Sequence, residues 1–154
     1  LVFPGITTNR NVDAEIEGAE FSARLSGSSG YLETAWTAID GEGAGGEDLA
    51  SIQADRAVLE GGIYLAGGEI TLGARLVGSA DRRDVPDGAL ATPGYGKTDV
   101  FAKYFPRGGA LRGFEFRLAI DNIFDKDFRI HPNGIDEPGR SFRITVARAF
   151  EWLK

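Results

Sequence analysis

The feature that most restricts the fold is a strict alternation of apolar and polar side chains near the end of the chain. Between positions 114 and 121, four apolar residues occupy every second position, and mostly polar residues lie between them. A repeat of two residues places the two kinds of side chain on opposite faces of a β-strand and fits no helix. The alternation recurs in the last strand, where one face would carry Phe142, Ile144, Val146, Arg148, Phe150 and Trp152. The chain is therefore predicted to be all-β and to end in a hairpin.

Six strands are predicted before the last one. The seven segments cover residues 12–26, 31–40, 55–65, 69–81, 98–105, 111–121 and 141–152. Most reach the roughly 9 to 11 residues with which a tilted strand crosses a bilayer. The apolar parity of the first strand changes at Gly18, which indicates a β-bulge there. In the fifth strand Phe101 and Tyr104 lie on opposite faces, so the pattern leaves its lipid side open.

Short and long connections alternate along the chain. The short ones are rich in glycine and cover residues 27–30, 66–68 and 106–110, where positive φ angles favour tight hairpins. The long polar ones cover residues 41–54, 82–97 and 122–140. Short turns at one end and long loops at the other are typical of transmembrane barrels. On the faces opposite the apolar rows we expect lumen-facing charges at Glu15, Glu17, Glu33, Arg75, Glu115 and Arg117.

Composition excludes several functions. The formal net charge is −6, and Lys and Arg are not clustered as a nucleic-acid surface requires, so no nucleic-acid partner is expected. The chain has one histidine and no cysteine, so neither a Ser/His/Asp nor a Cys/His set can be assembled. No metal-ligand spacing is recognisable either. We therefore expect neither an enzyme nor a metal centre. Without an apolar run of about 20 residues, any membrane insertion would be by strands.

An odd number of strands suggests a piece of a larger barrel. Bacterial single-chain barrels have even strand numbers, and seven strands leave two unpaired edges. The 154 residues contain no methionine, which fits a processed or excised piece. We expect the remaining strands to lie upstream of Leu1.

Four motifs, in order, carry a family resemblance. They lie at residues 14–20, 51–59, 92–104 and 121–142. The fourth is the most specific, because it joins Asp-Asn-Ile-Phe-Asp-Lys-Asp-Phe to a Pro-Gly-Arg-Ser-Phe entry into the last strand. Together they resemble the C-terminal part of TonB-dependent outer-membrane receptors. The likeness is greatest to the group that takes up haem or iron from haemoproteins and from transferrin- or lactoferrin-type carriers.

The resemblance implies an architecture and a function. Residues 1–154 would be the C-terminal portion of an antiparallel up-and-down β-barrel in the bacterial outer membrane, about the last seven of 22 strands, with the plug and other strands upstream. The whole protein would import haem or a ferric chelate as cargo, energised by the TonB complex through the missing N-terminal region. Its other partners would be outer-membrane lipid and a haemoprotein or siderophore.

Three alternatives stay open. The nearest is a TonB-dependent receptor for a ferric siderophore. A soluble β-barrel or sandwich binding protein would instead bury the apolar row that begins at Phe114. The third is a passive porin or adhesin barrel.

Candidate functional residues lie mainly in the expected extracellular loops. The possible ligand contacts are Arg82, Arg83, Tyr95, Arg129 and His131. An imidazole can ligate haem iron, but a solvated loop position is the simpler expectation for His131. The resemblance also implies that Phe150 and Trp152 form an assembly signal, although Leu153 and Lys154 follow where the family typically ends on an aromatic residue.

Overall fold

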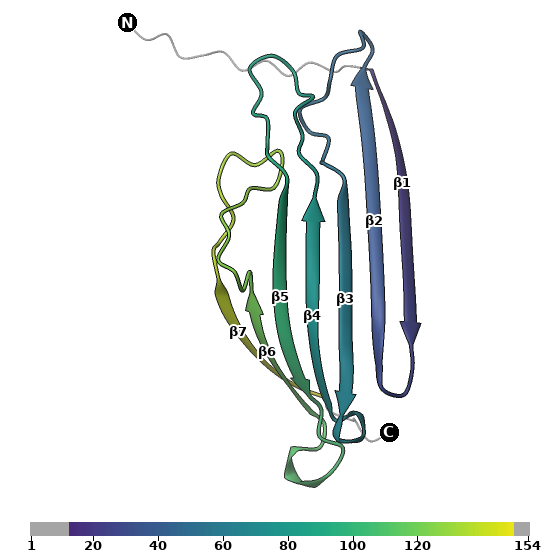
Figure 1. Cartoon of the computed structure of the whole chain (residues 1–154), viewed down its shortest axis with the longest axis vertical. Helices are drawn as coiled ribbons and strands as arrows, with labels where there is room; N and C mark the ends of the chain where they lie inside the picture. Colours follow the sequence, from purple (N-terminus) through teal and green to yellow (C-terminus); the bar gives the residue numbers. More distant parts are fainter. Residues whose placement is uncertain (1–12, 150–154) are drawn as a thin grey trace, which may run out of the picture.

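The computed structural model describes residues 13–149, which form seven antiparallel strands in one sheet. The strands are β1 (Ala14–Ser26), β2 (Gly30–Gly43), β3 (Arg56–Leu65), β4 (Ile70–Ser79), β5 (Tyr95–Tyr104), β6 (Phe114–Asp121) and β7 (Ser141–Arg148). Each pairs with the next in chain order (Figure 1), which confirms the up-and-down topology. Short 3₁₀ helices lie at Ala66–Gly68 and Gly109–Leu111. Phe150 and Trp152 lie outside the described residues.

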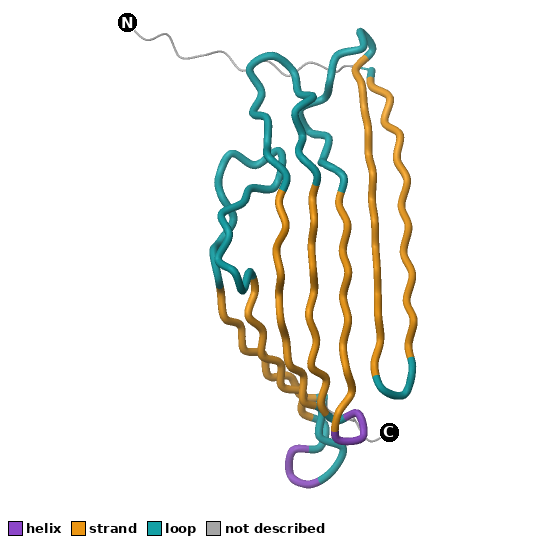
Figure 2. The backbone as a smooth tube through the Cα atoms, viewed as in Figure 1, coloured by secondary structure: helices purple, strands orange, loops and turns teal. Residues whose placement is uncertain are grey.

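The sheet is a single curved layer. Figure 2 shows the three long connections at one end and the short turns at the other, as the alternation of lengths predicted. Positive φ angles occur at Gly67 and Gly68 in the second short turn, as expected, whereas Gly27 and Gly30 have none. Gly30 is required for another reason, because a Cβ there would collide with the carbonyl of Gly62. No helix within residues 13–149 is long and apolar enough to cross a membrane.

One face of the sheet, the outer face, is apolar from edge to edge. Directly opposed residues in antiparallel strands share a face, so the register defines one row through all seven strands: Leu25, Leu32, Gly61, Ala74, Val100, Ile120 and Phe142. Leu25 and Phe142 are each 74% exposed, and the only buried hydrophobic residues of the described part are Ile52 and Val77. A face of this kind needs an apolar environment, which lipid supplies around a barrel.

The opposite face of the sheet, the inner face, carries a row of charged side chains. On each strand this row lies one residue away from the apolar row. This row consists of Arg24, Glu33, Glu60, Arg75 and Asp99. Arg24 lies 3.0 Å from Glu33 and Arg75 lies 2.6 Å from Glu60. The inner face is therefore polar, as the alternation predicted for a lumen.

Aromatic rings lie flat on the inner face where a neighbouring strand has glycine. Tyr31 lies over Gly62, and its hydroxyl donates a hydrogen bond of 2.7 Å to Glu60. Phe101 occupies the space over Gly73, where a Cβ would also come within 2.7 Å of the Gly61 carbonyl oxygen. These glycines therefore make room for the rings.

The predicted bulge at Gly18 is wrong. Pairing of β1 with β2 runs without a break from Ala14↔Gly43 to Ser26↔Tyr31, and Gly18 pairs with Ile39. The uninterrupted register places Glu15 and Glu17 on the outer face with Phe21, and not on the lumen side as expected. The switch of the apolar residues from one face to the other at Gly18 therefore marks the point along β1 where the outer face changes from apolar to acidic.

The remaining lumen predictions are confirmed by the register. Glu33, Arg75, Glu115 and Arg117 all lie on the inner face. The lipid side of β5, which the sequence left open, is the Tyr104 side, because Tyr104 pairs with Phe116 of the outer face.

An aromatic cluster marks the short-turn end of the outer face. The rings of Tyr104 and Phe116 stack with centroids 6.0 Å apart, and Phe114 stacks on Phe116 at 5.9 Å. The Arg148 guanidinium lies 4.9 Å from the Phe114 ring centre, which explains the one charge in the apolar row of the last strand. Aromatic girdles of this kind lie at membrane interfaces in barrels.

Candidate functional site

The three long connections, residues 44–55, 80–94 and 122–140, gather at one end of the sheet (Figure 1). Where these loops leave the strands, their backbone groups form hydrogen bonds that extend the pairing of the sheet. The Ala80 amide donates to the Asp55 carbonyl at 2.8 Å, and Arg82 and Thr92 exchange two hydrogen bonds of 2.9 Å within the second loop. The loops therefore start from defined positions at the ends of the strands.

His131 is buried between these loops and is not solvated. Only 5% of its surface is exposed, so the expectation of a solvated position is wrong. Its Nδ1 lies 3.0 Å from Thr92 Oγ1 in the second loop, and its Nε2 lies 2.9 Å from the Ala50 carbonyl oxygen in the first. Sequence reasoning missed both partners, which are 39 and 81 residues away along the chain.

Three of the five predicted contact residues meet at one small cavity between the loops. Tyr95, Arg129 and His131 line it, together with Arg56 and Thr92. Its volume of about 30 Å³ is enough for roughly two water molecules. Arg56 was not predicted from the sequence. The alternation of side chains in β3 nevertheless places Arg56 on the inner face, at the end of the strand next to the loops.

The two arginines of the second loop have different environments. Only 12% of the Arg82 side chain is exposed; its Nη2 lies 3.5 Å from Asp40 Oδ1, and its Nε has no hydrogen-bond partner within residues 13–149. Arg83 is 80% exposed and pairs with Asp81. Arg83 can therefore meet a ligand directly, whereas Arg82 is part of the loop packing.

Arg129 is held near an acid in its own loop. Its Nε lies 3.8 Å from Asp136 Oδ1 and has no hydrogen-bond partner in the described part of the chain. The adjacent Phe128 packs on the ring of Tyr95 with centroids 4.5 Å apart. The third loop therefore rests on the loop end of β5.

The family-like motif at the start of the third loop forms a closed turn. Asn122 is buried and has φ 53°, and its amide N–H donates to Asp99 Oδ1 at 2.8 Å. Its side chain accepts from the Lys126 N–H at 3.0 Å and donates to the Lys126 carbonyl at 2.8 Å. Asp125 then accepts from the Arg140 N–H at 2.6 Å, which joins the two ends of the loop. The motif therefore shapes the base of the third loop.

Two hollows on the inner face lie below this loop. They share Arg75, Asp99, Asp121 and Arg143. Lys97 binds Asp99 at 3.1 Å, and Arg143 binds Asp121 at 3.0 Å. The surface leading from the loops along the inner face is therefore charged but internally paired.

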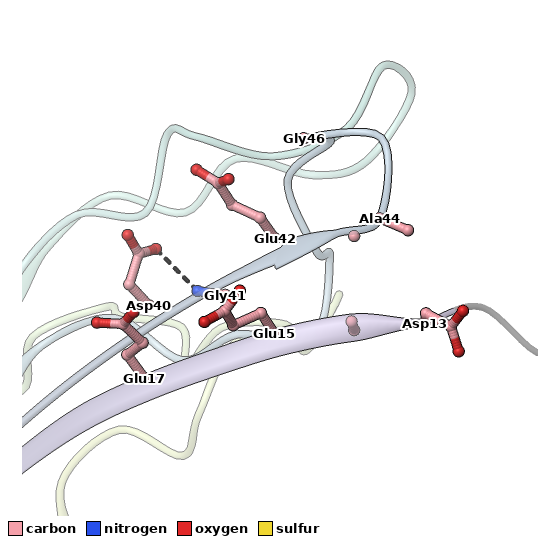
Figure 3. A pocket seen from close by; sticks show the side chains of 10 residues that line it. Asp13, Glu15, Glu17, Asp40, Gly41, Glu42, Ala44 and Gly46 are labelled. Carbon is pink, nitrogen blue, oxygen red and sulfur yellow. Dashed lines mark hydrogen bonds between the residues drawn. The ribbon is translucent and has the colours of Figure 1, made fainter.

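A third hollow lies on the outer side of β1 and β2, where Figure 3 shows several carboxylates around the strand ends. Glu15 pairs in register with Glu42, and Glu17 pairs with Asp40. Like charges directly opposite each other are unfavourable. No group of three or more His, Asp or Glu residues within 13–149 is arranged to hold a metal ion. These acids therefore limit how far the apolar outer face extends.

Comparisons with known proteins give a consistent result. Residues 2–123 match the family model described as TonB dependent receptor-like, beta-barrel. The heme/hemopexin utilization protein C of Haemophilus influenzae strain Rd is 26% identical over 140 residues, which are 90% of this chain and 19% of that protein. Its counterpart from strain 86-028NP has the same identity, with 20% of its length covered. The chain thus spans about a fifth of the curated relatives it matches.

Two solved structures have the same fold. The copper transporter OprC aligns with a TM-score of 0.79 at 21% identity, covering 91% of this chain and 24% of that one. The FrpB iron transporter from Neisseria meningitidis, F5-1 variant, aligns with a TM-score of 0.70 at 16% identity, covering 86% and 23%. At these identities the likeness is one of architecture.

Proposed function

Because this chain belongs to the TonB-dependent receptor β-barrel family, we propose that residues 1–154 are the C-terminal portion of a 22-stranded receptor whose plug and other strands lie upstream. The family consists of transporters of the bacterial outer membrane and not of enzymes. The observation that carries the proposal is the pair of rows in the register, apolar outside and charged inside. The apolar row supports lipid as the neighbour of the outer face.

The proposed cargo is haem, or iron taken from a haemoprotein. Support comes from the curated relatives, whose names state haem and hemopexin utilization, at 26% identity. A ferric siderophore is the second candidate, because iron transport also occurs within this architecture. The 154 residues contain no cysteine or methionine, the side chains that favour Cu(I), so this segment offers no support for copper.

The proposed mechanism assigns a different task to each part of the segment. The long loops bind the cargo, the plug moves when the TonB complex acts on it, and the cargo passes along the charged inner face. Arg83, Tyr95 and Arg129 are the proposed ligand contacts. Arg56 lies with Tyr95 and Arg129 at the small cavity and is added to them. Arg82 and His131, which are buried, support the loops from within.

Uptake by the full-length receptor tests this function. We expect a strain that produces it to grow on haemin as the only iron source, and to lose that growth when TonB is removed. Exchange of Arg129 for Ala should weaken haemin binding, with Arg112→Ala at the opposite end of the barrel as the control. Growth on a ferric siderophore alone would favour the second candidate, and growth that persists without TonB would exclude active uptake and favour a passive barrel.

The soluble alternative makes a different prediction. It requires the row beginning at Phe114 to be covered, whereas Leu118 in that row is 54% exposed. A full-length protein that stays monomeric and folded without detergent would contradict the membrane assignment.

A further inference from the structure

The three long loops are linked through one side chain of the third. His131 lies in residues 122–140 and bonds to Thr92 in residues 80–94 and to Ala50 in residues 44–55. Thr92 is buried as deeply as His131, with 4% of its surface exposed. A hydrogen bond between two buried groups is costly to break, because bulk water does not reach the groups that are left behind.

The Ala50 carbonyl determines which ring nitrogen must donate. The Ala50 carbonyl oxygen can only accept, so Nε2 carries the hydrogen and donates to it at 2.9 Å. In the neutral ring Nδ1 then carries the lone pair, which accepts from the Thr92 hydroxyl at 3.0 Å. Both nitrogens are occupied, so the ring has no lone pair available for a metal while these contacts persist.

Other contacts fix the first and third loops to the ends of strands. Ile52 in the first loop is buried against Gly41, where a Cβ would lie 2.8 Å from the Ile52 Cδ1 atom. Phe128 of the third loop packs on Tyr95, which follows the second loop. Packing therefore anchors the first and third loops to strands, and the imidazole adds a polar link from the third loop to both others.

We propose that His131 is a positioning residue that couples the three long loops, so that they change position as one unit. Disturbing the third loop at this side chain then loosens the first and second loops, although their contact points, Ala50 and Thr92, lie 81 and 39 residues away in the chain. Such coupling is reciprocal, so a ligand held by any one loop orders the other two. The coupling itself does not depend on the proposed function. Only the statement that a ligand binds at these loops rests on that function.

Hydrogen–deuterium exchange of the ligand-free full-length receptor in detergent tests the coupling directly. His131→Ala should speed exchange about tenfold at the Ile52 amide of the first loop and at the Arg82 and Thr92 amides of the second, the scale expected for losing one buried hydrogen bond. Arg83→Ala, at an exposed position of the second loop, should leave the Ile52 amide unchanged. Faster exchange confined to residues 122–140 would overturn the proposal.

Conservative variants separate the two bonds and guard against misfolding. In His131→Gln the amide nitrogen can replace Nε2 and keep the bond to Ala50, so the first loop should stay protected while the second exchanges faster. Thr92→Val should affect the second loop in the same way. If Gln loosens the first loop as much as Ala does, the link through Nε2 is refuted.

Haemin binding, followed by absorbance, separates positioning from iron ligation. We expect His131→Ala to weaken haemin binding about tenfold and His131→Gln to restore part of it, with an unchanged spectrum of bound haemin. A shifted spectrum in both variants would identify His131 as an iron ligand and overturn the positioning role. If the receptor binds no haemin, the proposed cargo is wrong, and the exchange experiment still decides the coupling.

Discussion

Exchange of Asn122 for Ala and for Gly provides a sharp test of how the third loop is built. Asn122 is 2% exposed, and its side chain makes two hydrogen bonds to Lys126, of 2.8 and 3.0 Å. Each is worth about 0.5 to 1.5 kcal/mol, so their loss costs about 1 to 3 kcal/mol. The φ of 53° adds about 1 kcal/mol for Ala, because Ala lacks the short polar side chain with which Asn tolerates the left-handed region.

The two variants therefore differ in a defined way. Asn122→Ala should lower the local free energy of opening by about 2 to 4 kcal/mol, which is about 30- to 1,000-fold faster exchange in residues 122–140. Asn122→Gly loses the same bonds but tolerates the φ, and its own entropic cost is smaller. We expect it to be less severe than Ala by up to about 1 kcal/mol.

The assay is hydrogen–deuterium exchange at the Lys126 and Arg140 amides of the full-length receptor, both of which are bonded to this turn. Phe124→Ala is the control, because its ring is 67% exposed within the same turn. If Ala and Gly both exchange within twofold of the natural protein, the bonds of Asn122 do not hold the loop. If Gly is the more severe variant, the φ argument is wrong.

Two further predictions concern the faces of the sheet. Gly73→Val should collide with Phe101 and destabilise the barrel by about 1 to 3 kcal/mol in thermal unfolding, whereas Gly78→Val in the same strand has open space and should be nearly neutral. Leu118→Arg places a charge on the outer face and should cost up to about 2 to 4 kcal/mol when the receptor folds into lipid vesicles. Ala119→Arg, which points to the inner face, should cost much less; equal costs would contradict the assignment of the faces.

Local periodicity predicts those parts of the fold that depend on neighbours in the chain. The alternation at residues 114–121 was enough to assign a strand and its two faces, because side chains in a strand alternate strictly. The same argument predicted a bulge at Gly18 that is absent. A switch of apolar residues between faces can mark the end of the apolar band as well as a bulge, and the pattern does not distinguish the two. It failed again at His131, whose environment depends on Thr92 and Ala50, and no local pattern encodes partners so distant in the chain.

The rings that lie flat over glycines have a consequence for the width of the barrel. A large side chain on the inner face normally projects towards the axis and narrows the channel. Tyr31 and Phe101 instead occupy the space that Gly62 and Gly73 leave empty on the adjacent strands. The inner surface thereby gains the stiffness of packed aromatic rings while the free diameter is preserved. Such a wall would leave room for the bulky cargo proposed above.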